Sequence, residues 1–254
     1  MYLVNYVQIY IKKIQKLICV AYNIKFTTQN KNAIIHLVIF MKLNINSKEF
    51  KEAISVERMR KSDEYTIKKY TDSKTLMLRA AKGIYDLEIW YGKKIAIVCG
   101  SGNNGGDGYA LACLIAKHGY SADIIRVTEK FSQDGKYYYN MAKEMGVKDY
   151  EFNENTNLSH YDIVVDCILG TGFKGEPTGN VKLAIEKIND SGAYVVSADI
   201  NSGLNGDTGE GEIAVKSDMT VSIGFYKKGL FLGRATELIK EMKNVDIGIE
   251  LVDC

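Results

Sequence analysis

The chain has 254 residues, of which 46% are hydrophobic and 25% are charged, with a net charge of +2. This length and composition suit a folded protein with one good core and exclude the disordered and fibrous classes. The five cysteines contain no CxxC pair and are odd in number, so neither a disulfide framework nor a zinc site is indicated. We therefore expect an intracellular protein in a reducing compartment, the cytoplasm.

Residues 1–48 differ from the rest of the chain because they carry seven lysines and no acidic residue. Their apolar stretches are interrupted too often for a clear transmembrane helix, and no cleavage site of the secretory type follows. We interpret this segment as a basic N-terminal extension, with Met41 as an alternative start. Organellar targeting by residues 1–40, or a helix on a membrane surface, is the competing interpretation.

Residues 50–254 form one predicted domain in which strands and helices alternate. Each predicted strand is a short run rich in β-branched residues, and each helix ends near a glycine. The predicted helices are at 55–70, 75–90, 108–119, 134–146 and 180–192. The predicted strands are at 93–99, 121–127, 161–169, 193–200, 217–224 and 243–249.

Such alternation requires right-handed crossovers and a mostly parallel sheet with helices on both faces. The predicted fold class is therefore α/β, a Rossmann-like doubly wound sheet in a three-layer α/β/α sandwich. The strands at 217–224 and 243–249 are expected to close one edge of the sheet. The domain has no run of basic residues, which argues against a nucleic-acid partner.

Three loops rich in glycine and oxygen-bearing side chains follow predicted strands, at 100–108, 166–179 and 199–212. Ligands bind at this edge of the sheet in doubly wound folds. The first loop contains a GxGxxG pattern, which alone is weak support for a dinucleotide site.

Asp107 follows that pattern, where a helix is expected to begin. A carboxylate in the first helical turn would repel an arriving phosphate unless a cation screens it. The alternative is that Asp107 only caps the helix, which would contribute about 1 kcal/mol. Capping does not explain the two asparagines beside it.

The side chains of these loops are oxygen donors with few charges. Asn103 and Asn104 offer amide oxygens, Asp166 ends the third strand, and Ser202 follows the fourth. Oxygen donors select hard cations, whereas zinc or copper would require histidine or thiolate. Because magnesium and calcium usually bind more carboxylates than Asp166 alone provides, the residues favour a monovalent ion such as potassium.

With these loops, the chain resembles the YjeF N-terminal domain family, the NAD(P)H-hydrate epimerases. The resemblance rests on GSGNNGGDG, VVDCILGTGFKGE and SADINSGLNGDTGE, supported by ISVERMRKSDEYTI, SDMTVSIGFYKKGL and VDIGI. It covers about residues 50–250 in order and leaves residues 1–48 outside.

The resemblance implies an isomerase that interconverts the R and S forms of hydrated NADH and NADPH. It also implies one potassium ion per subunit, bound by Asn104, Asp166 and Ser202. The implied substrate-binding residues are Asn103, Asn104, Gly105, Gly106, Asp107, Gly170, Thr171, Gly172, Phe173, Lys174, Gly175, Glu176 and Asp199.

Asp199 matches the acid of the family's DIPSG element and is our candidate for proton transfer. We assign Lys174 a catalytic role as well, to orient a phosphate or tune the acid, although an exposed loop charge is the alternative. Asn201 replaces the family's proline, so the loop that holds Ser202 is expected to be less preorganised.

The chain is too short for a fused dehydratase, so we expect a separate NAD(P)H-hydrate dehydratase to remove the hydrate. Family analogy suggests a homodimer. Two other function classes stay open: a non-catalytic binding or scaffold module, and an NAD-dependent oxidoreductase. Such oxidoreductases usually have an acid about twenty residues after the glycines. This chain has Arg126 and Glu129 there, which neither supports nor excludes an oxidoreductase.

Overall fold

The computed structural model describes residues 48–253, so the predicted extension lies almost entirely outside them. The chain divides into two compact units, Met1–Lys51 and Glu52–Cys254. Of the first unit only the start of a short helix, α3 (Lys48–Glu52), is described. None of the described helices combines the length and the hydrophobicity that a membrane span needs.

In the described residues, seven parallel strands form one sheet in the order β3-β2-β1-β4-β5-β6-β7. The strands are β1 (Ile95–Cys99), β2 (Ala122–Arg126), β3 (Lys148–Glu151), β4 (Ile163–Cys167), β5 (Tyr194–Ala198), β6 (Ser217–Ile223) and β7 (Ile239–Val245). The direction of strand addition reverses between β1 and β4. This reversal places a ligand-binding crevice at the carboxyl ends of these two strands.

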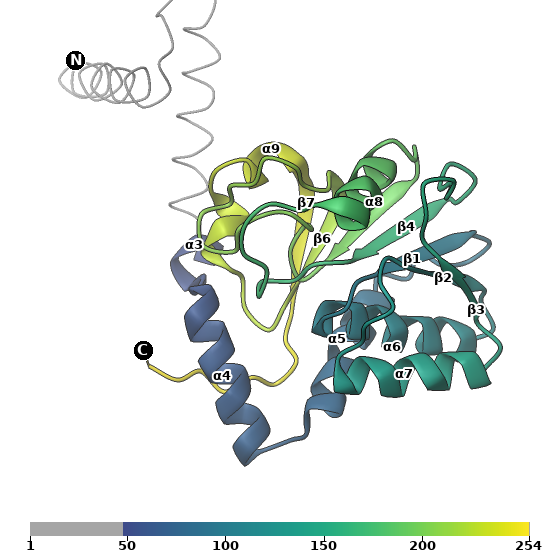
Figure 1. Cartoon of the computed structure of the whole chain (residues 1–254). Helices are drawn as coiled ribbons and strands as arrows, with labels where there is room; N and C mark the ends of the chain where they lie inside the picture. Colours follow the sequence, from purple (N-terminus) through teal and green to yellow (C-terminus); the bar gives the residue numbers. More distant parts are fainter. Residues whose placement is uncertain (1–47, 254) are drawn as a thin grey trace, which may run out of the picture. The chain divides into compact units, whose positions relative to one another are not determined.

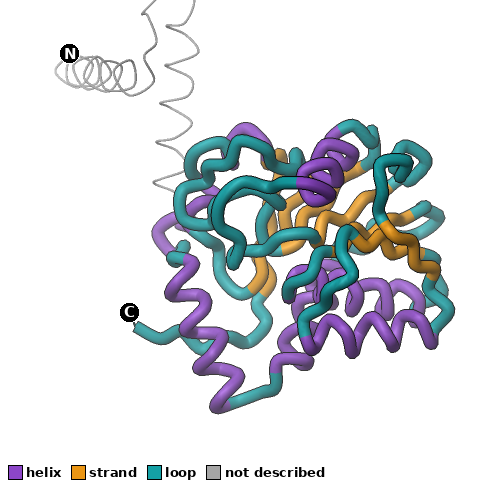
Figure 2. The backbone as a smooth tube through the Cα atoms, in the orientation of Figure 1, coloured by secondary structure: helices purple, strands orange, loops and turns teal. Residues whose placement is uncertain are grey.

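Helices cover both faces of the sheet (Figures 1 and 2). They are α4 (Val56–Lys69), α5 (Ser73–Tyr85), α6 (Asn103–Lys117), α7 (Gln133–Glu144), α8 (Gly179–Asn189), η1 (Lys228–Phe231) and α9 (Ala235–Leu238). Alternate residues of β1, such as Ile95 and Ile97, pack in one core with α5, α6 and α7. The intervening residues Ala96 and Val98 pack in a second core with α8. The predicted doubly wound α/β sandwich is therefore confirmed.

The two edge strands differ from the prediction. Strand β3 has no counterpart among the predicted elements because its sequence, KDYE, is polar and mostly exposed. Strand β7 begins four residues before the predicted strand at 243–249, since its own residues are only partly buried at the sheet edge. Ile247 and Ile249 carry the stronger hydrophobic pattern, but they pack into the core beyond the end of the strand.

Helix α4 is held to the rest of the unit at its start, where the Val56 N–H donates to Asp207 Oδ1 (2.9 Å), and along its length by the C-terminal segment. Ser55 caps the first turn without the glutamate of a full capping box. The C-terminal segment runs along the helix, where the Val252 N–H donates to Ser62 Oγ (3.2 Å) and the Glu250 N–H donates to Thr66 Oγ1 (2.9 Å). Figure 1 shows this segment beside α4. The helix therefore forms a stable wall for the space next to it.

Candidate functional site

The first predicted loop turns directly into helix α6. The helix begins at Asn103, five residues before the predicted start, and Gly102 is its N-cap with no side-chain cap. Asp107 therefore lies in the second turn, and the alternative in which it caps the helix is wrong. An uncapped N-terminus leaves backbone N–H groups available to a ligand.

The two glycines inside this helix allow close packing. A Cβ at Gly105 would lie 2.1 Å from the carbonyl oxygen of Gly100, and a Cβ at Gly106 would lie 2.4 Å from Met77 Cε. Neither glycine lines the cavity that lies beside the start of this helix. Their contacts are therefore with the protein itself.

The side chains predicted to bind potassium meet around the loop after β4. Asp166 is fully buried and accepts hydrogen bonds from Ser202 Oγ (2.5 Å), the Ser202 N–H (2.9 Å) and Ser197 Oγ (3.0 Å). Ser202 Oγ also accepts from the Leu169 N–H (2.8 Å), and the Leu169 carbonyl accepts from Asn104 Nδ2 (2.9 Å). We call Asn104, Asp166, Leu169 and Ser202 the Asp166 centre.

One oxygen of the Asp166 centre has no partner. Asn104 Oδ1 is buried and accepts no hydrogen bond from the described residues. An unpaired buried acceptor costs about 1–3 kcal/mol, which favours an added donor or cation at this atom. Burial raises the pKa of Asp166, and the hydrogen bonds from Ser202 act in the opposite direction. A set of oxygens with a single carboxylate fits a hard cation of low charge.

Asn201 stands where the resembling family has proline. Its side chain is fully buried, and Nδ2 donates to the Val215 carbonyl and to Ser217 Oγ (both 2.9 Å). Its Oδ1 accepts from Thr220 Oγ1 (2.6 Å). Three side-chain hydrogen bonds thus hold the loop before Ser202 in place of a proline ring.

Asp199 follows β5 in an unusual backbone conformation. Its φ is +66°, in the left-handed region, where a residue other than glycine costs about 1–3 kcal/mol. Its carboxylate accepts from the Thr171 N–H (3.3 Å) and forms an ion pair with Lys227. Lys227 is only 1% exposed and also donates to the Ile223 carbonyl (2.8 Å). The backbone and two partners therefore fix the direction of this carboxylate.

Lys227 is absent from the predicted site residues. In the sequence it is the first of two adjacent lysines after β6, a pattern that usually indicates the surface. Its neighbour Lys228 is indeed exposed. A parallel bridge between Lys227 and Ile54 holds its backbone beside the start of α4. Only the position of Asp199 in the fold explains why this lysine is buried.

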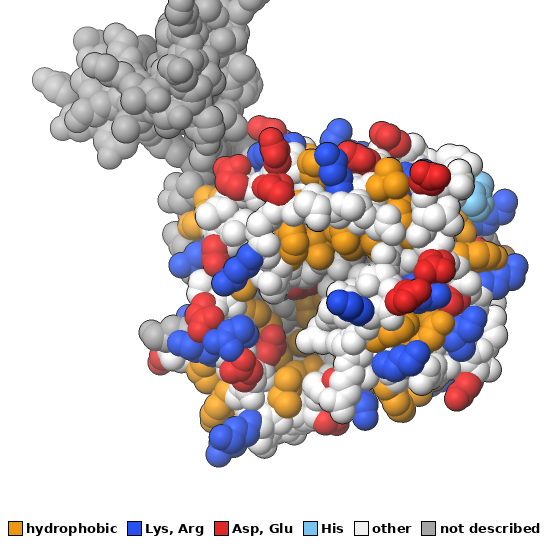
Figure 3. Space-filling model, in the orientation of Figure 1, with side chains coloured by type: hydrophobic (Ala, Val, Ile, Leu, Met, Phe, Trp, Pro, Cys, Tyr) orange, Lys and Arg blue, Asp and Glu red, His pale blue; other side chains and the backbone are white. Residues whose placement is uncertain are grey.

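A cavity of about 550 Å³ opens at the carboxyl ends of β1, β4 and β5. Figure 3 shows this face hollowed between α4 and the body of the unit. Residues 101–104, 168–173 and Asp199 line one side, and α4 and α5 contribute the others. The volume lies in the range of small-molecule sites. The apolar lining includes Met59, Leu76, Met77, Ile223 and Ile247.

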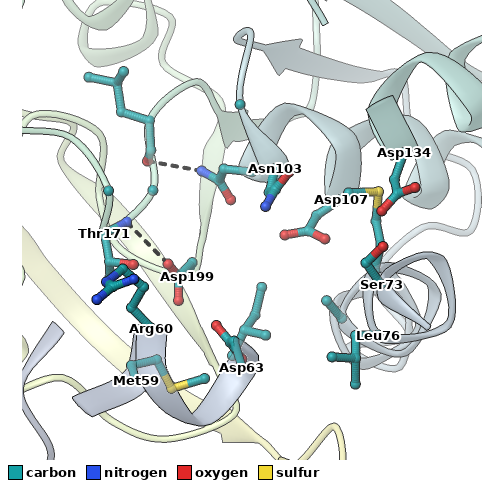
Figure 4. Close-up of a pocket in the computed structure, with 18 of the residues that line it drawn as sticks. Met59, Arg60, Asp63, Ser73, Leu76, Asn103, Asp107, Asp134, Thr171 and Asp199 are labelled. Atoms are coloured by element: carbon teal, nitrogen blue, oxygen red, sulfur yellow. Dashed lines mark hydrogen bonds between the residues drawn. The ribbon is translucent and has the colours of Figure 1, made fainter. Parts of the chain in front are cut away.

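Four carboxyl groups line this cavity: Asp63, Asp107, Asp134 and Asp199. Burial raises the pKa of Asp63 to about 6, and the Lys227 ammonium acts against that rise. Burial also raises the pKa of Asp107 well above its usual range, with smaller contributions from the charges of Asp199 and Asp63. In Figure 4 Asp63, Asp107 and Asp199 point toward a common space. The cavity thus contains two acids whose pKa is raised by burial and a third, Asp199, that has a cationic partner.

The second predicted loop contributes only in part. Residues 170–173 line the cavity, whereas Lys174, Gly175 and Glu176 do not. Lys174 is exposed. The Glu176 carboxylate accepts from the Glu212 N–H (3.2 Å) and so links this loop to the third one. The charged end of the loop therefore lies apart from Asp199.

Arg126 ends β2, where NAD-dependent oxidoreductases usually carry a free acid. Its Nε donates to Asp149 Oδ1 (2.8 Å), and its guanidinium lies 5.7 Å from the centre of the Tyr139 ring. Neither Arg126 nor Glu129 lines the cavity. The end of β2 presents a neutralised ion pair rather than the ribose-binding carboxylate of those enzymes.

A known family and several relatives match this chain. A family model described as YjeF-related protein N-terminus matches residues 73–229. A protein named NAD(P)H-hydrate epimerase from Lentilactobacillus buchneri is 33% identical, over 78% of this chain and 95% of its own length. A protein of the same name from Oenococcus oeni is 33% identical, over 77% of this chain and 96% of its own length.

Longer relatives and a solved structure extend these similarities. A protein from Dictyoglomus turgidum named bifunctional NAD(P)H-hydrate repair enzyme Nnr is 37% identical, over 63% of this chain but only 32% of its own length. The crystal structure of yeast ynu0 has the same fold, with a TM-score of 0.65 and 18% identity over 80% of this chain and 96% of that one. The chain belongs to the family of YjeF-related protein N-termini.

Proposed function

We propose that this protein is an NAD(P)H-hydrate epimerase, an isomerase that interconverts the R and S forms of hydrated NADH and NADPH. The observation that carries the proposal is the cavity beyond β1, β4 and β5, where Thr171 and Lys227 hold the Asp199 carboxylate. The names of relatives matched over nearly their whole length support the same reaction. The proposed reaction includes no oxidation or reduction step.

The hydrate carries a hydroxyl group on the ring carbon beside the ring nitrogen. Epimerisation requires that this hydroxyl leave with a proton, that the nitrogen electrons stabilise a planar cation, and that water return. Asp199 is the proposed proton-transfer residue because its carboxylate faces the cavity in a fixed direction. Lys227 neutralises this carboxylate from outside the lining of the cavity.

The remaining predicted residues have proposed binding roles. Residues 170–173 would contact the substrate, and the free N–H groups at the start of α6 suit its pyrophosphate. Because burial raises the pKa of Asp107 well above its usual range, its carboxyl group would donate a hydrogen bond to a phosphate rather than repel it. Lys174 would approach a phosphate from the exposed part of its loop.

We also propose one potassium ion, held by oxygens of Asn104, Asp166 and Ser202. The unpaired Asn104 Oδ1 and the donor set with a single carboxylate support it. When bound, the ion would supply a positive charge close to the phosphates of the substrate. Thermal unfolding in potassium chloride and in tetramethylammonium chloride of equal ionic strength tests the ion directly. We expect a higher midpoint with potassium, and equal midpoints would contradict the site.

The relatives named bifunctional repair enzymes are much longer than the part that this chain matches. We propose that a dehydratase on a separate chain consumes one epimer of the hydrate. The present chain would supply that epimer from the other one.

The proposed reaction is tested with the purified full chain and one resolved epimer of the NADH hydrate. We expect the second epimer to form faster than without protein, with no change in the oxidation state of the nicotinamide. An inert protein would favour the scaffold alternative, and formation of NAD⁺ would favour an oxidoreductase.

A further inference from the structure

The cavity contains a carboxyl group that no sequence motif singled out, Asp63 on helix α4. We infer that Asp63 is a second proton-transfer residue, which serves the face of the nicotinamide ring opposite to the face served by Asp199. This inference rests on the proposed function and specifies how both epimers are handled.

The stereochemistry of the reaction calls for two groups. The hydroxyl leaves from one face of the planar cation, and the water that creates the other epimer adds to the opposite face. A carboxyl group must lie within hydrogen-bond reach of the proton that it transfers. A ring that stays in place therefore needs one proton-transfer group on each of its faces.

Asp63 and Asp199 enter the cavity from different walls. Asp199 follows strand β5, whereas Asp63 projects from α4, and Figure 4 shows both carboxyl groups pointing into the same space. The residue before Asp63 is anchored because Ser62 Oγ accepts from the Val252 N–H (3.2 Å). Met59, one turn earlier, is 5% exposed in the core. These contacts hold the backbone of α4 at Asp63 beside the cavity.

The two carboxyl groups have opposite surroundings. Asp199 has a cationic partner, Lys227, and a backbone donor, both of which bind a carboxylate. Asp63 receives no hydrogen bond from any described residue, and burial raises its pKa to about 6. The charges of Asp199 and Glu64 contribute to this rise, and Lys227 opposes it. Two acids in contrasting environments form the usual arrangement of a general acid with a general base.

The other two acids of the cavity fit this role less well. Burial raises the pKa of Asp107 well above its usual range, which favours the neutral acid over the carboxylate that accepts a proton. Asp134 lies in the first turn of α7, beyond the Ser132 cap, on the far side of Asp107 in Figure 4. Asp63 can both lose and regain a proton near neutral pH, as a proton-transfer group must.

The proposed step conserves atoms and electrons. Protonated Asp63 gives its proton to the ring hydroxyl, the carbon–oxygen bond breaks with its electron pair on the departing water, and the nitrogen lone pair forms the iminium bond. A water on the Asp199 side then bonds to the same carbon, its proton passes to Asp199, and the iminium pair returns to nitrogen. The reverse reaction exchanges the two roles, and solvent restores the starting protonation states.

Exchange of oxygen in ¹⁸O-water separates this mechanism from one with a single acid. Each resolved epimer is incubated with wild-type protein and with Asp63→Asn, and both the inversion of the ring carbon and the incorporation of ¹⁸O are measured. We expect inversion by Asp63→Asn to fall by about 100-fold or more. The epimer whose hydroxyl faces Asp199 should still incorporate ¹⁸O, within about 10-fold of wild type, because Asp199 can release and return water on one face.

Two results would overturn the inference. One is inversion by Asp63→Asn within a few-fold of wild type, and the other is an equal loss of inversion and exchange. If wild-type protein shows neither process, the proposed function itself fails. Asp190→Asn, an exposed position after α8, is the matched control and should behave as wild type in both measurements.

A conservative variant protects the test against misfolding. Asp63→Glu keeps the carboxyl group and moves it by one methylene group. We expect it to lower inversion more than exchange, whereas an equal decrease would again overturn the inference. The thermal unfolding midpoint of each variant shows whether it is folded.

Discussion

Two aspartates on adjacent strands have different surroundings in this protein. Asp166, within β4, is fully buried and binds hydroxyl and backbone donors only. Asp199, just after β5, reaches the cavity from a left-handed backbone conformation and has the buried cation Lys227 as its partner. The Asp166 centre joins the three loops to one another, whereas Asp199 faces the cavity.

This difference separates the stability of the site from its chemistry. Changes at the Asp166 centre should first alter loop order and ion binding, because its atoms bind one another. Changes around Asp199 should first alter the reaction rate. If variants of both regions altered ion binding and reaction rate equally, the two regions would be one functional unit.

Replacing Lys227 should have the largest effect. Lys227→Met removes the cation of a buried ion pair, which costs about 3 kcal/mol of unfolding free energy. We also expect the epimerisation rate to fall by about 100-fold, since Asp199 loses the partner that orients it. Urea unfolding and the epimerisation assay measure the two effects. Lys228→Met, at the exposed neighbour, should change neither, and a similar loss there would argue against the ion pair.

Replacing Ser202 should mainly affect stability and ion binding. Ser202→Ala removes the hydroxyl between Asp166 and the Leu169 N–H, and we expect a loss of about 2 kcal/mol. The increase of the unfolding midpoint with potassium should also disappear. Ser121→Ala, at an exposed position, is the control. An unchanged potassium response in Ser202→Ala would contradict the ion site.

The pH dependence of stability should report Asp63. Its pKa rises from 3.8 in the unfolded chain to about 6 in the folded protein, so the folded state binds the proton more tightly. The stability from this group is therefore present below pH 4 and is lost as the pH rises through 6, by on the order of 3 kcal/mol. Urea unfolding at pH 4.5 and 7.5 should show a smaller decrease for Asp63→Asn than for wild type. An identical decrease would mean that Asp63 is not buried as described.

Replacing Lys174 should have the smallest effect. This lysine is exposed and outside the lining of the cavity, so Lys174→Met should raise KM and keep kcat within about 3-fold of wild type. Steady-state kinetics with each epimer provide the measurement. A decrease in kcat as large as that of Lys227→Met would restore the predicted catalytic role of Lys174.

The alternating β-branched and helical patterns predicted the fold because the central strands are buried on both faces. The edge strands β3 and β7 were harder to place, since polar, half-exposed strands lack a hydrophobic pattern. Each edge strand is defined by backbone hydrogen bonds to the adjacent strand, and the local sequence does not show which strand that is.

The loop motifs predicted Asn104, Asp166, Asp199 and Ser202, and the structure brings three of them together in the Asp166 centre. Lys227 and Asp63 could not be found in the same way. They lie within the quoted segments ISVERMRKSDEYTI and SDMTVSIGFYKKGL, but each is a charged residue among other charged residues there. Only the fold pairs Lys227 with Asp199 and places Asp63 in the same cavity.

The most direct test compares the rates at which wild-type protein and Asp199→Asn interconvert the resolved epimers of the NADH hydrate. The substitution keeps the size of the side chain, so the unfolding midpoint should show a folded protein. We predict rapid interconversion by wild type and a rate at least about 100-fold lower for Asp199→Asn. A folded Asp199→Asn variant that interconverts the epimers as fast as wild type would contradict the proposed role of this cavity.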